Sequence, residues 1–202
     1  MSEAKVFCSP LITYDEKTEA ISELCRYYEE GLEVWIDNDT LSTDMTVHTS
    51  EEAATLKKFL LDYVKKGGNM IVQYNTNRRV NVDPPYPLKL SRDRVTDEFS
   101  EVTILDETHE LLNFPNKITA EDFKGWVQER GLYFPNAWDE NFTAILSMYD
   151  KGELPKNGSL LIAKYGEGNY IYTGLSFFRE LPAGVSGAYK LFANMLSVGK
   201  KK

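Results

Sequence analysis

Residues 158–175, GSLLIAKYGEGNYIYTGL, consist of two apolar runs on either side of Gly166, Glu167 and Gly168. Two β-prone runs separated by a short glycine-containing turn predict an antiparallel hairpin. The hairpin leads into GLSFFREL at 174–181, which places two phenylalanines, an arginine and a glutamate after its second strand. This stretch therefore decides the fold of the C-terminal part and brings charged and aromatic side chains to one corner of it.

Strand-like and helix-like segments alternate through the first third of the chain, and single elements follow further on. Strands are expected over 5–9, 32–37, 69–75, 101–106 and 144–148, and helices over 16–31, 53–68, 118–131 and 188–197. Thr49 with Glu52 forms a capping-box pattern, Thr119 is a second N-cap, and Gly31 and Gly67 end their helices. Strands joined by helices of this length imply right-handed crossovers. The prediction is an α/β fold with a mainly parallel sheet, helices on both faces and the C-terminal antiparallel hairpin.

The stretch from Thr76 to Glu98 is expected to be a long irregular loop. It contains DPPYP at 83–87, and prolines disfavour both helix and central strand. Long loops in compact domains are usually functional, so this one is predicted to be a lid or the wall of a cleft. Residues 1–199 form a single domain in this interpretation, followed by a basic tail at 200–202.

Charge and hydropathy exclude several classes of partner. The 202 residues include 23 basic and 31 acidic side chains, a net charge of -8, which repels nucleic acid and anionic membranes. The chain has no apolar run of about 18 residues and no N-terminal signal pattern. It is therefore expected to be soluble and, as written, cytoplasmic.

Cysteines and histidines are too few to indicate metal or redox chemistry. Cys8 and Cys25 lie on apolar faces of a predicted strand and helix, which is ordinary for buried thiols. His48 and His109 are far apart and each lies in a polar setting, so a metal site would need carboxylates for most of its ligands. No metal and no cofactor is expected.

Polar residues follow the predicted strands and recur in three segments that pair arginine with acid beside aromatics: 90–99, 125–135 and 176–184. Ligands of open parallel sheets bind beyond the carboxyl ends of the strands. The candidate ligand-binding residues are Asn75, Asn77, Arg78, Arg92, Arg94, Glu129, Arg130, Arg179 and Glu180. Arginine–carboxylate pairs bind sugar hydroxyls or anions, and they also form buried ion-pair networks that hold loops in place. Both interpretations stay open.

The order of elements resembles class I glutamine amidotransferase-like domains, the flavodoxin-like group that includes ThuA-like proteins. The resemblance implies a flavodoxin-like three-layer sandwich. In that group a Gly-x-Cys-x-Gly elbow carries the nucleophile, and a His-x-Glu pair precedes the last helix. The run VQYNT at 72–76 lies where the elbow would be, and SFFRE at 176–180 lies where a QFHPE-like run would be. Phe178 then matches the histidine and Glu180 the glutamate.

Both catalytic positions of this resemblance are lost. Phenylalanine cannot accept a proton, and Gln73, Tyr74 and Asn75 are poor nucleophiles without activation. Cys8 is no substitute, because nothing places it on an elbow beside a base. Glutamine hydrolysis is therefore not expected, and the chain resembles a pseudoenzyme.

A narrower resemblance covers residues 63–199. The runs QYNTNRR, PYPLKLSRDRVTDE, NKITAEDFKGWVQERGLYFP and GAYKLFANML, with the hairpin and SFFRELPAG, are similar to a domain fused to the C-terminus of bacterial PIG-L/LmbE-type deacetylases. That family acts on N-acetylglucosaminyl substrates and is often exported. The resemblance implies a deacetylase domain or a small carbohydrate as partner. The deacetylase motif His-Pro-Asp-Asp is absent, so this chain alone is not expected to deacetylate anything.

Three functions follow in order of preference. The first is a non-catalytic accessory domain that binds carbohydrate through arginines, acids and the aromatics Tyr86, Trp126, Tyr133, Trp138 and Phe177. Core packing is the alternative for these rings, and it is favoured for Trp126 and Phe178. The second is a scaffold that packs on a partner. The third is a hydrolase with Glu180, Glu98 or Glu129 as general base and Arg92, Arg94 or Arg179 stabilising an anion.

Overall fold

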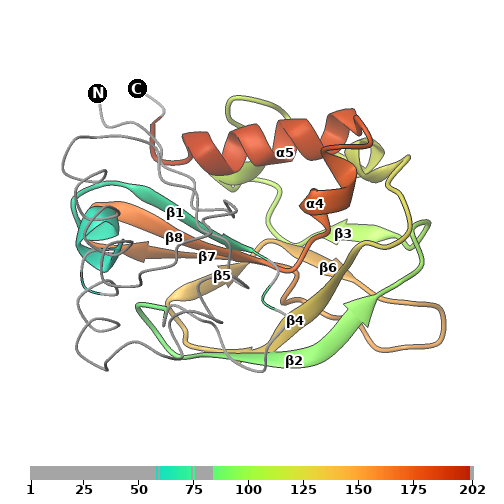
Figure 1. Cartoon of the computed structure of the whole chain (residues 1–202), viewed down its shortest axis with the longest axis horizontal. Helices are drawn as coiled ribbons and strands as arrows, with labels where there is room; N and C mark the ends of the chain where they lie inside the picture. Colours follow the sequence, from blue (N-terminus) through green and yellow to red (C-terminus); the bar gives the residue numbers. More distant parts are fainter. Residues whose placement is uncertain (1–57, 59, 74, 76–83, 201–202) are drawn as a thin grey trace, which may run out of the picture.

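The structure is a computed structural model that describes residues 58, 60–73, 75 and 84–200 (Figure 1). Several sequence predictions lie outside the described residues and stay predictions. They are the elements at 5–9, 16–31 and 32–37, the first part of the helix at 53–68, Cys8, Cys25, His48, Asn77 and Arg78.

A four-stranded mixed sheet forms the centre of the described chain. Its order is β1-β8-β7-β5, with β1 at Asn69–Gln73, β8 at Gly168–Thr173, β7 at Leu160–Tyr165 and β5 at Phe142–Ala144. Only β1 and β8 run parallel; β7 is antiparallel to both of its neighbours. The predicted hairpin is confirmed as β7 and β8, joined at Gly166, whose φ of 60° suits glycine.

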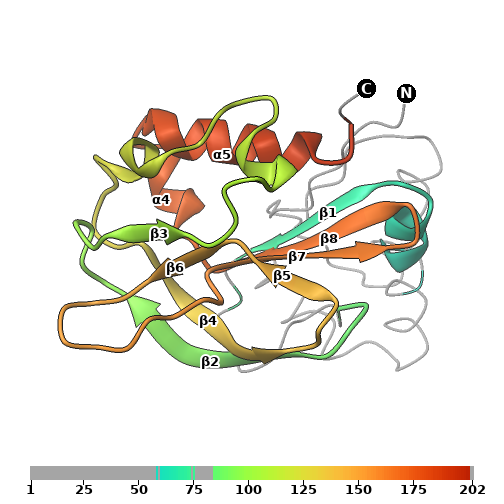
Figure 2. The ribbon, with the colours of Figure 1, turned by 180° about the vertical axis from the view of Figure 1, so that it is seen from behind.

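Two smaller antiparallel sheets extend from this centre. One pairs β2, Leu88–Val95, with β4, Gly131–Trp138, and the other pairs β3, Val102–Ile104, with β6, Leu146–Met148. The helices of this part are α4, Phe177–Glu180, and α5, Ser186–Ser197, with 3-10 turns η1 at Glu110–Leu112 and η2 at Ala120–Phe123. Figure 2 shows α5 lying across one side of the sheets.

The prediction of a mainly parallel, flavodoxin-like sandwich is wrong for the described chain. More of its residues lie in strands than in helices, the one larger sheet is mixed, and the other two are antiparallel pairs. Part of the reason lies in the segment from Thr76 to Glu98, which the sequence predicts to be one long loop. The prolines end at Pro87, and the next eight residues alternate between covered and exposed positions as β2.

The predicted helix over 118–131 is also wrong beyond its first turn. Thr119 does cap it, since its side chain and that of Asp122 form a capping box, but the turn ends at Phe123. Gly125 and Gln128 have φ of 74° and 67°, which no α-helix accommodates. Gly131 begins β4 rather than ending a helix. The predicted strand at 144–148 is divided between β5 and β6.

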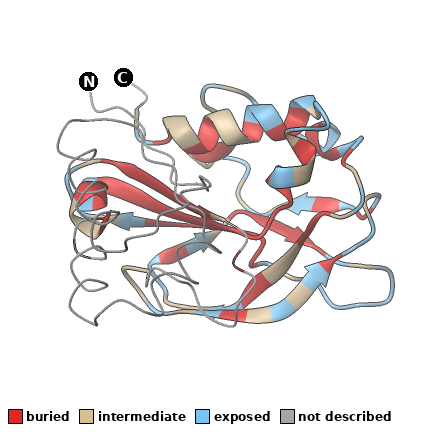
Figure 3. Ribbon diagram, in the orientation of Figure 1, coloured by how far each residue is buried: buried red, intermediate tan, exposed pale blue. Residues whose placement is uncertain are grey.

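The strands of the central sheet are largely buried (Figure 3), and their apolar residues pack in two cores, one on each face. One face, with Ile71 and Ile171, packs in the same core as Leu191 and Met195 of α5. The other face, with Tyr170 and Tyr172, packs against helical residues that include Val64. Gly67, at φ 103°, follows this helix as the sequence predicts. The predicted last helix is confirmed as α5.

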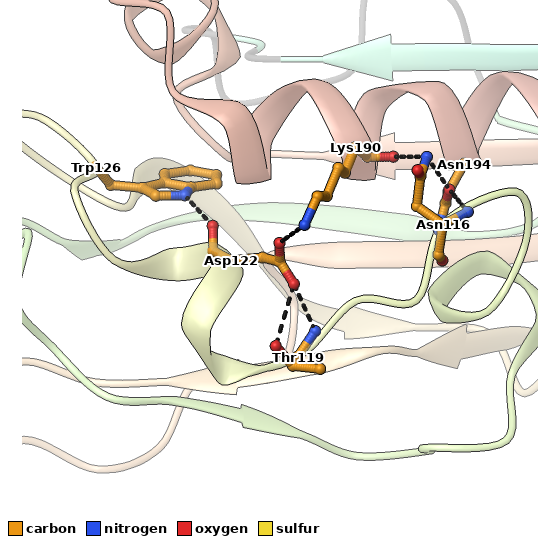
Figure 4. A network of polar contacts seen from close by, with 6 residues as sticks. All are labelled: Asn116, Thr119, Asp122, Trp126, Lys190 and Asn194. Atoms are coloured by element: carbon orange, nitrogen blue, oxygen red, sulfur yellow. Dashed lines mark hydrogen bonds and ion pairs between the residues drawn. The ribbon is translucent and has the colours of Figure 1, made fainter.

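A network of polar contacts fastens α5 to η2 (Figure 4). The Asp122 carboxylate accepts hydrogen bonds from the backbone N–H of Thr119 at 2.8 Å and from its hydroxyl at 3.2 Å, and it pairs with Lys190 Nζ at 2.7 Å. The Trp126 indole donates to the Asp122 carbonyl at 3.1 Å. A Cβ on Gly187 would lie 1.8 Å from that same carbonyl oxygen, so only glycine lets α5 approach so closely.

Asn194 provides the second attachment of α5. Its side chain is buried, and Nδ2 donates to the carbonyls of Leu111 and Asn116, each at 2.8 Å. Its Oδ1 accepts from the backbone N–H of Asn116 at 2.9 Å and from the side-chain amide of Asn116 at 3.1 Å. Every hydrogen-bonding group of this buried amide is therefore satisfied, as buried polar groups require.

Replacing Asn194 should destabilise the protein strongly. Asn194→Leu would leave the carbonyls of Leu111 and Asn116 without their donor in the interior, and each such group costs about 1–3 kcal/mol. We expect a loss of about 3 kcal/mol in the free energy of unfolding, measured by urea denaturation. The exposed Asn157→Leu is the control and should stay within about 0.5 kcal/mol of wild type. Equal effects would contradict the role of Asn194.

Asp122 should make stability depend on acid. Burial opposes its ionisation, but hydrogen bonds from Lys190 and Thr119 outweigh burial and lower the pKa of Asp122 below its ordinary 3.8. Its contribution is therefore complete above that value and lost as the pH falls below it. Asp122→Asn should cost about 2 kcal/mol at neutral pH, and the difference from wild type should shrink below about pH 4 in urea titrations. The neighbouring exposed Glu121→Gln is the control and should stay within about 0.5 kcal/mol of wild type at neutral pH.

Candidate functional site

Two of the three arginine–acid segments meet backbone to backbone. Leu132 N–H donates to the Gly174 carbonyl at 3.0 Å, Ser176 N–H donates to the Arg130 carbonyl at 3.1 Å, and Gly131 forms an isolated bridge with Leu175. A Cβ on Gly131 would lie 2.2 Å from the Gly174 carbonyl oxygen, so the approach requires glycine. We call residues 127–132 and 174–180 the junction.

Glu180 is the buried carboxylate of the junction. Its side chain, at the end of α4, has 0% exposure, and the Val127 N–H donates to its two oxygens at 3.0 and 3.3 Å. Burial raises the pKa of Glu180, and the charge of Glu98 adds to that rise. The Val127 N–H and the charges of Arg130 and Arg179 oppose it without cancelling it.

Arg130 ties the junction to two other segments. Its Nε and Nη2 donate to the Ser100 carbonyl at 3.2 and 2.7 Å, and its Nη1 donates to the Phe123 carbonyl. The guanidinium carbon lies 5.9 Å from the centre of the Trp126 ring. Burial lowers the pKa of Arg130, and the charge of Glu180 is the largest effect opposing it. An arginine stays charged at any physiological pH, so this buried cation serves as structural support.

Glu129 and Arg179 form an ion pair at the surface of the junction. Arg179 Nε donates to Glu129 Oε1 at 3.1 Å, and the Ser176 hydroxyl donates to the same oxygen at 3.2 Å. The Arg179 guanidinium carbon lies 4.8 Å from the centre of the Phe178 ring. The Phe178 residue is 47% exposed. The pair therefore holds a guanidinium beside an aromatic ring at the protein surface.

The other candidate residues are spread over the fold. Arg92 and Arg94 are exposed on β2 and make no hydrogen bond or ion pair to the junction within the described chain. Asn75 is buried just after β1. Glu98 is half-buried and acts on Glu180 and Arg130 through its charge. The junction thus brings together four of the predicted residues: Glu129, Arg130, Arg179 and Glu180.

The aromatic predictions divide in the same way. Trp126 is buried, as predicted, but Phe178 is exposed and Phe177 is buried in its place. Tyr86 and Trp138 pack against the core that contains Tyr170 and Tyr172. Tyr86 makes edge contacts with Phe142 and Tyr165, with ring centres 6.2 and 5.9 Å apart. The predicted sugar-stacking role of these two rings has no support in this packing.

Tyr189 is a surface residue that the sequence reasoning missed. It is 52% exposed on α5, and its hydroxyl donates to the Leu181 carbonyl at 2.7 Å, one helical turn beyond Phe178. Its position next to the inward-facing Ala188 and two before Leu191 places it on the outer side of the helix, a signal present in the sequence. We call Phe178, Arg179 and Tyr189 the aromatic–arginine surface.

The described part of the chain contains neither a metal-binding cluster nor a membrane-spanning helix. Within it, no group of three or more His, Cys, Asp or Glu side chains is placed to hold a metal ion. His109 caps η1 instead, its Nδ1 accepting from the Leu111 N–H at 3.1 Å. None of the described helices has the length and apolar character needed to cross a membrane.

Comparisons with known proteins give similarity at a low level. Neither protein-family models nor curated proteins match the chain. A β-galactosidase from Rahnella sp. R3 has 14% identity and a TM-score of 0.42, over 71% of this chain but only 20% of that chain. A cytoplasmic protein from Salmonella typhimurium has 12% identity and a TM-score of 0.48, over 97% of this chain and 98% of that chain.

A second cytoplasmic protein, from Salmonella typhimurium LT2, has 12% identity and a TM-score of 0.43. That alignment covers 72% of this chain and 61% of the other. Similarities of this strength carry no argument about function. The resemblance to amidotransferase-like and deacetylase-linked domains therefore stays a prediction.

Proposed function

We propose that this chain is a non-catalytic accessory domain that binds carbohydrate and associates with a PIG-L-type deacetylase. The observation that carries the proposal is the aromatic–arginine surface, where Arg179 lies beside the exposed ring of Phe178 while Glu129 fixes its Nε. The deacetylase association rests on the resemblance of residues 63–199 alone.

The junction favours binding over catalysis. A general base must reach its substrate directly or through one water, and Glu180 has no exposed surface. The Glu129 side chain is mostly covered as well, and its Oε1 accepts hydrogen bonds from Arg179 and Ser176. In this position the Glu129 carboxylate holds Arg179 and Ser176 in place. The proposal therefore gives neither Glu180 nor Glu129 a catalytic role.

The aromatic–arginine surface has the chemistry that sugars need. Aromatic rings stack on the apolar faces of sugar rings, and exposed arginine nitrogens donate hydrogen bonds to sugar hydroxyls. The Nε of Arg179 is taken by Glu129, and its two terminal nitrogens make no hydrogen bond within the described chain. Tyr189 adds a second exposed ring on the neighbouring helix.

Phe178→Ala should weaken sugar binding. The probe is N-acetylglucosamine or its disaccharide, titrated by NMR with the expected millimolar affinity. Loss of one stacking ring should weaken binding about tenfold, corresponding to about 1.4 kcal/mol. Phe99→Ala is the matched control, because Phe99 is also an exposed phenylalanine but lies outside this surface. It should leave binding unchanged.

Two results would contradict this proposal. If neither sugar changes any chemical shift at high concentration, the proposed carbohydrate binding is wrong. Release of ammonia from glutamine by the purified protein, above the level of a Phe178→Ala and Glu129→Gln variant, would remove the non-catalytic assignment.

Glu180→Gln should change how stability depends on pH. Because the pKa of Glu180 is raised by folding, the folded chain binds its proton more tightly than the unfolded chain does. Its effect on stability therefore becomes less favourable as the pH rises above the ordinary value of 4.5. In urea denaturation from about pH 4 to 7, the variant should gain stability relative to wild type as the pH rises. A constant difference in stability between Glu180→Gln and wild type across this pH range would contradict the expected shift.

A further inference from the structure

Two neighbouring loops display apolar side chains that the fold does not cover. Phe99, in the β2–β3 loop, is 83% exposed, and Leu154, in the β6–β7 loop, is 84% exposed. Tyr149, at the start of the second loop, is also exposed. Figures 1 and 2 show both loops at the same end of the molecule. We call residues 96–101 and 149–156 the Phe99–Leu154 surface.

Asp150 locks the two loops together. Its carboxylate accepts hydrogen bonds from the backbone N–H groups of Thr96 and Asp97 at 3.0 Å and from the Thr96 hydroxyl at 3.0 Å. Burial opposes its ionisation, but these hydrogen bonds outweigh it and lower the pKa of Asp150. The lock is therefore intact at neutral pH.

The tips of both loops are ordered as well. The Phe99 N–H donates to the Asp97 side chain at 2.9 Å, a local turn that fixes the backbone below the ring. The second loop is closed by Met148 and Lys156, which exchange backbone hydrogen bonds at 3.1 and 2.9 Å, and by Glu153 N–H, which donates to the Asp150 carbonyl. Large apolar side chains held this firmly in water mark an interaction surface better than scattered ones do.

The charge around these side chains selects the partner. The surface carries five carboxylates, on Asp97, Glu98, Glu101, Asp150 and Glu153, against the two cations of Lys151 and Lys156. Lys156 is paired with Glu153. An excess of negative charge attracts a basic partner and repels a second copy of the same face.

We propose that the Phe99–Leu154 surface docks a basic polypeptide segment, one that places an apolar side chain between lysines or arginines. The apolar side chain covers Phe99 and Leu154, and the cations face the surrounding carboxylates. This inference goes beyond the carbohydrate proposal and shares no residue with the aromatic–arginine surface, so either one stands or fails without the other.

The test uses two fluorescein-labelled peptides and the full chain. The first alternates lysine with leucine and phenylalanine, Lys-Leu-Lys-Phe-Lys-Leu-Lys, and the second has glutamate in place of each lysine. Fluorescence anisotropy should show saturable binding of the basic peptide only, weakening several-fold between about 50 and 200 mM salt. Equal binding of the acidic peptide would overturn the proposal.

Variants separate specific docking from general attraction to an acidic protein. Phe99→Ser with Leu154→Ser removes two exposed side chains and no net charge, and it should weaken the basic peptide at least tenfold. Phe178→Ser with Tyr189→Ser removes two other large side chains, which are 47% and 52% exposed elsewhere on the protein, and should leave peptide binding unchanged. Unchanged binding by the first pair would overturn the proposal. So would a dimer in sedimentation velocity that the first pair abolishes, because the occupant would then be a second copy.

Discussion

The contact between Gly131 and Gly174 is the constraint on which the described structure depends. The two backbones approach so closely that a Cβ on either residue would collide with the opposite chain, at 2.2 Å from the Gly174 carbonyl or 2.5 Å from the Leu132 carbonyl. This approach carries the end of β8 alongside the start of β4. It therefore joins the central sheet to the β2–β4 sheet.

The same contact explains why a buried charge is tolerated at this point. Since Arg130 directly precedes Gly131, its side chain is drawn into the interior, where its donors meet the carbonyls of Ser100 and Phe123. Burying a guanidinium is favourable only when its donors are satisfied. The β2–β3 loop and η2 thus lie against the junction, where the carbonyls of Ser100 and Phe123 accept the hydrogen bonds of Arg130. The charge that holds the junction also positions the elements around it.

Local sequence patterns predicted the hairpin, β1, β3 and α5, because each has a strong apolar period or a glycine turn of its own. They failed where distant contacts decide. The segment 118–131 has helical spacing, yet its helical turn ends at Phe123. Beyond it, the contacts of Arg130 and Gly131 at the junction hold the chain in another conformation. β2 was hidden by neighbouring prolines, and its pairing with β4 could not be seen from either segment alone.

The sequence predicts which residues form the candidate site, but not which of them are buried and which are exposed. The sequence identified Glu129, Arg130, Arg179 and Glu180, and the junction brings them together. Which of them is buried depends on the short helix α4, whose four residues are too few for a periodic pattern. For that reason Phe177 and Phe178 were exchanged between core and surface. Tyr189 lies on the outer side of the last helix, whereas the strand ends point to other residues.

Two carboxylates in this protein do the same task under opposite electrostatic conditions. Asp150 and Glu180 each accept hydrogen bonds from the backbone of another segment. Asp150 accepts from two N–H groups and from the hydroxyls of Thr96 and Ser100, whereas Glu180 accepts only from the Val127 N–H among the described residues. The pKa of Asp150 is lowered and that of Glu180 is raised, although burial opposes ionisation in both. Asp150 has more donors and the nearby charge of Lys156, whereas the charge of Glu98 adds to the rise at Glu180. As the pH rises above about 4.5, the contribution of Asp150 to stability is therefore retained while that of Glu180 becomes less favourable. The two surfaces proposed for binding thus rest on supports that respond differently to the same change in the medium.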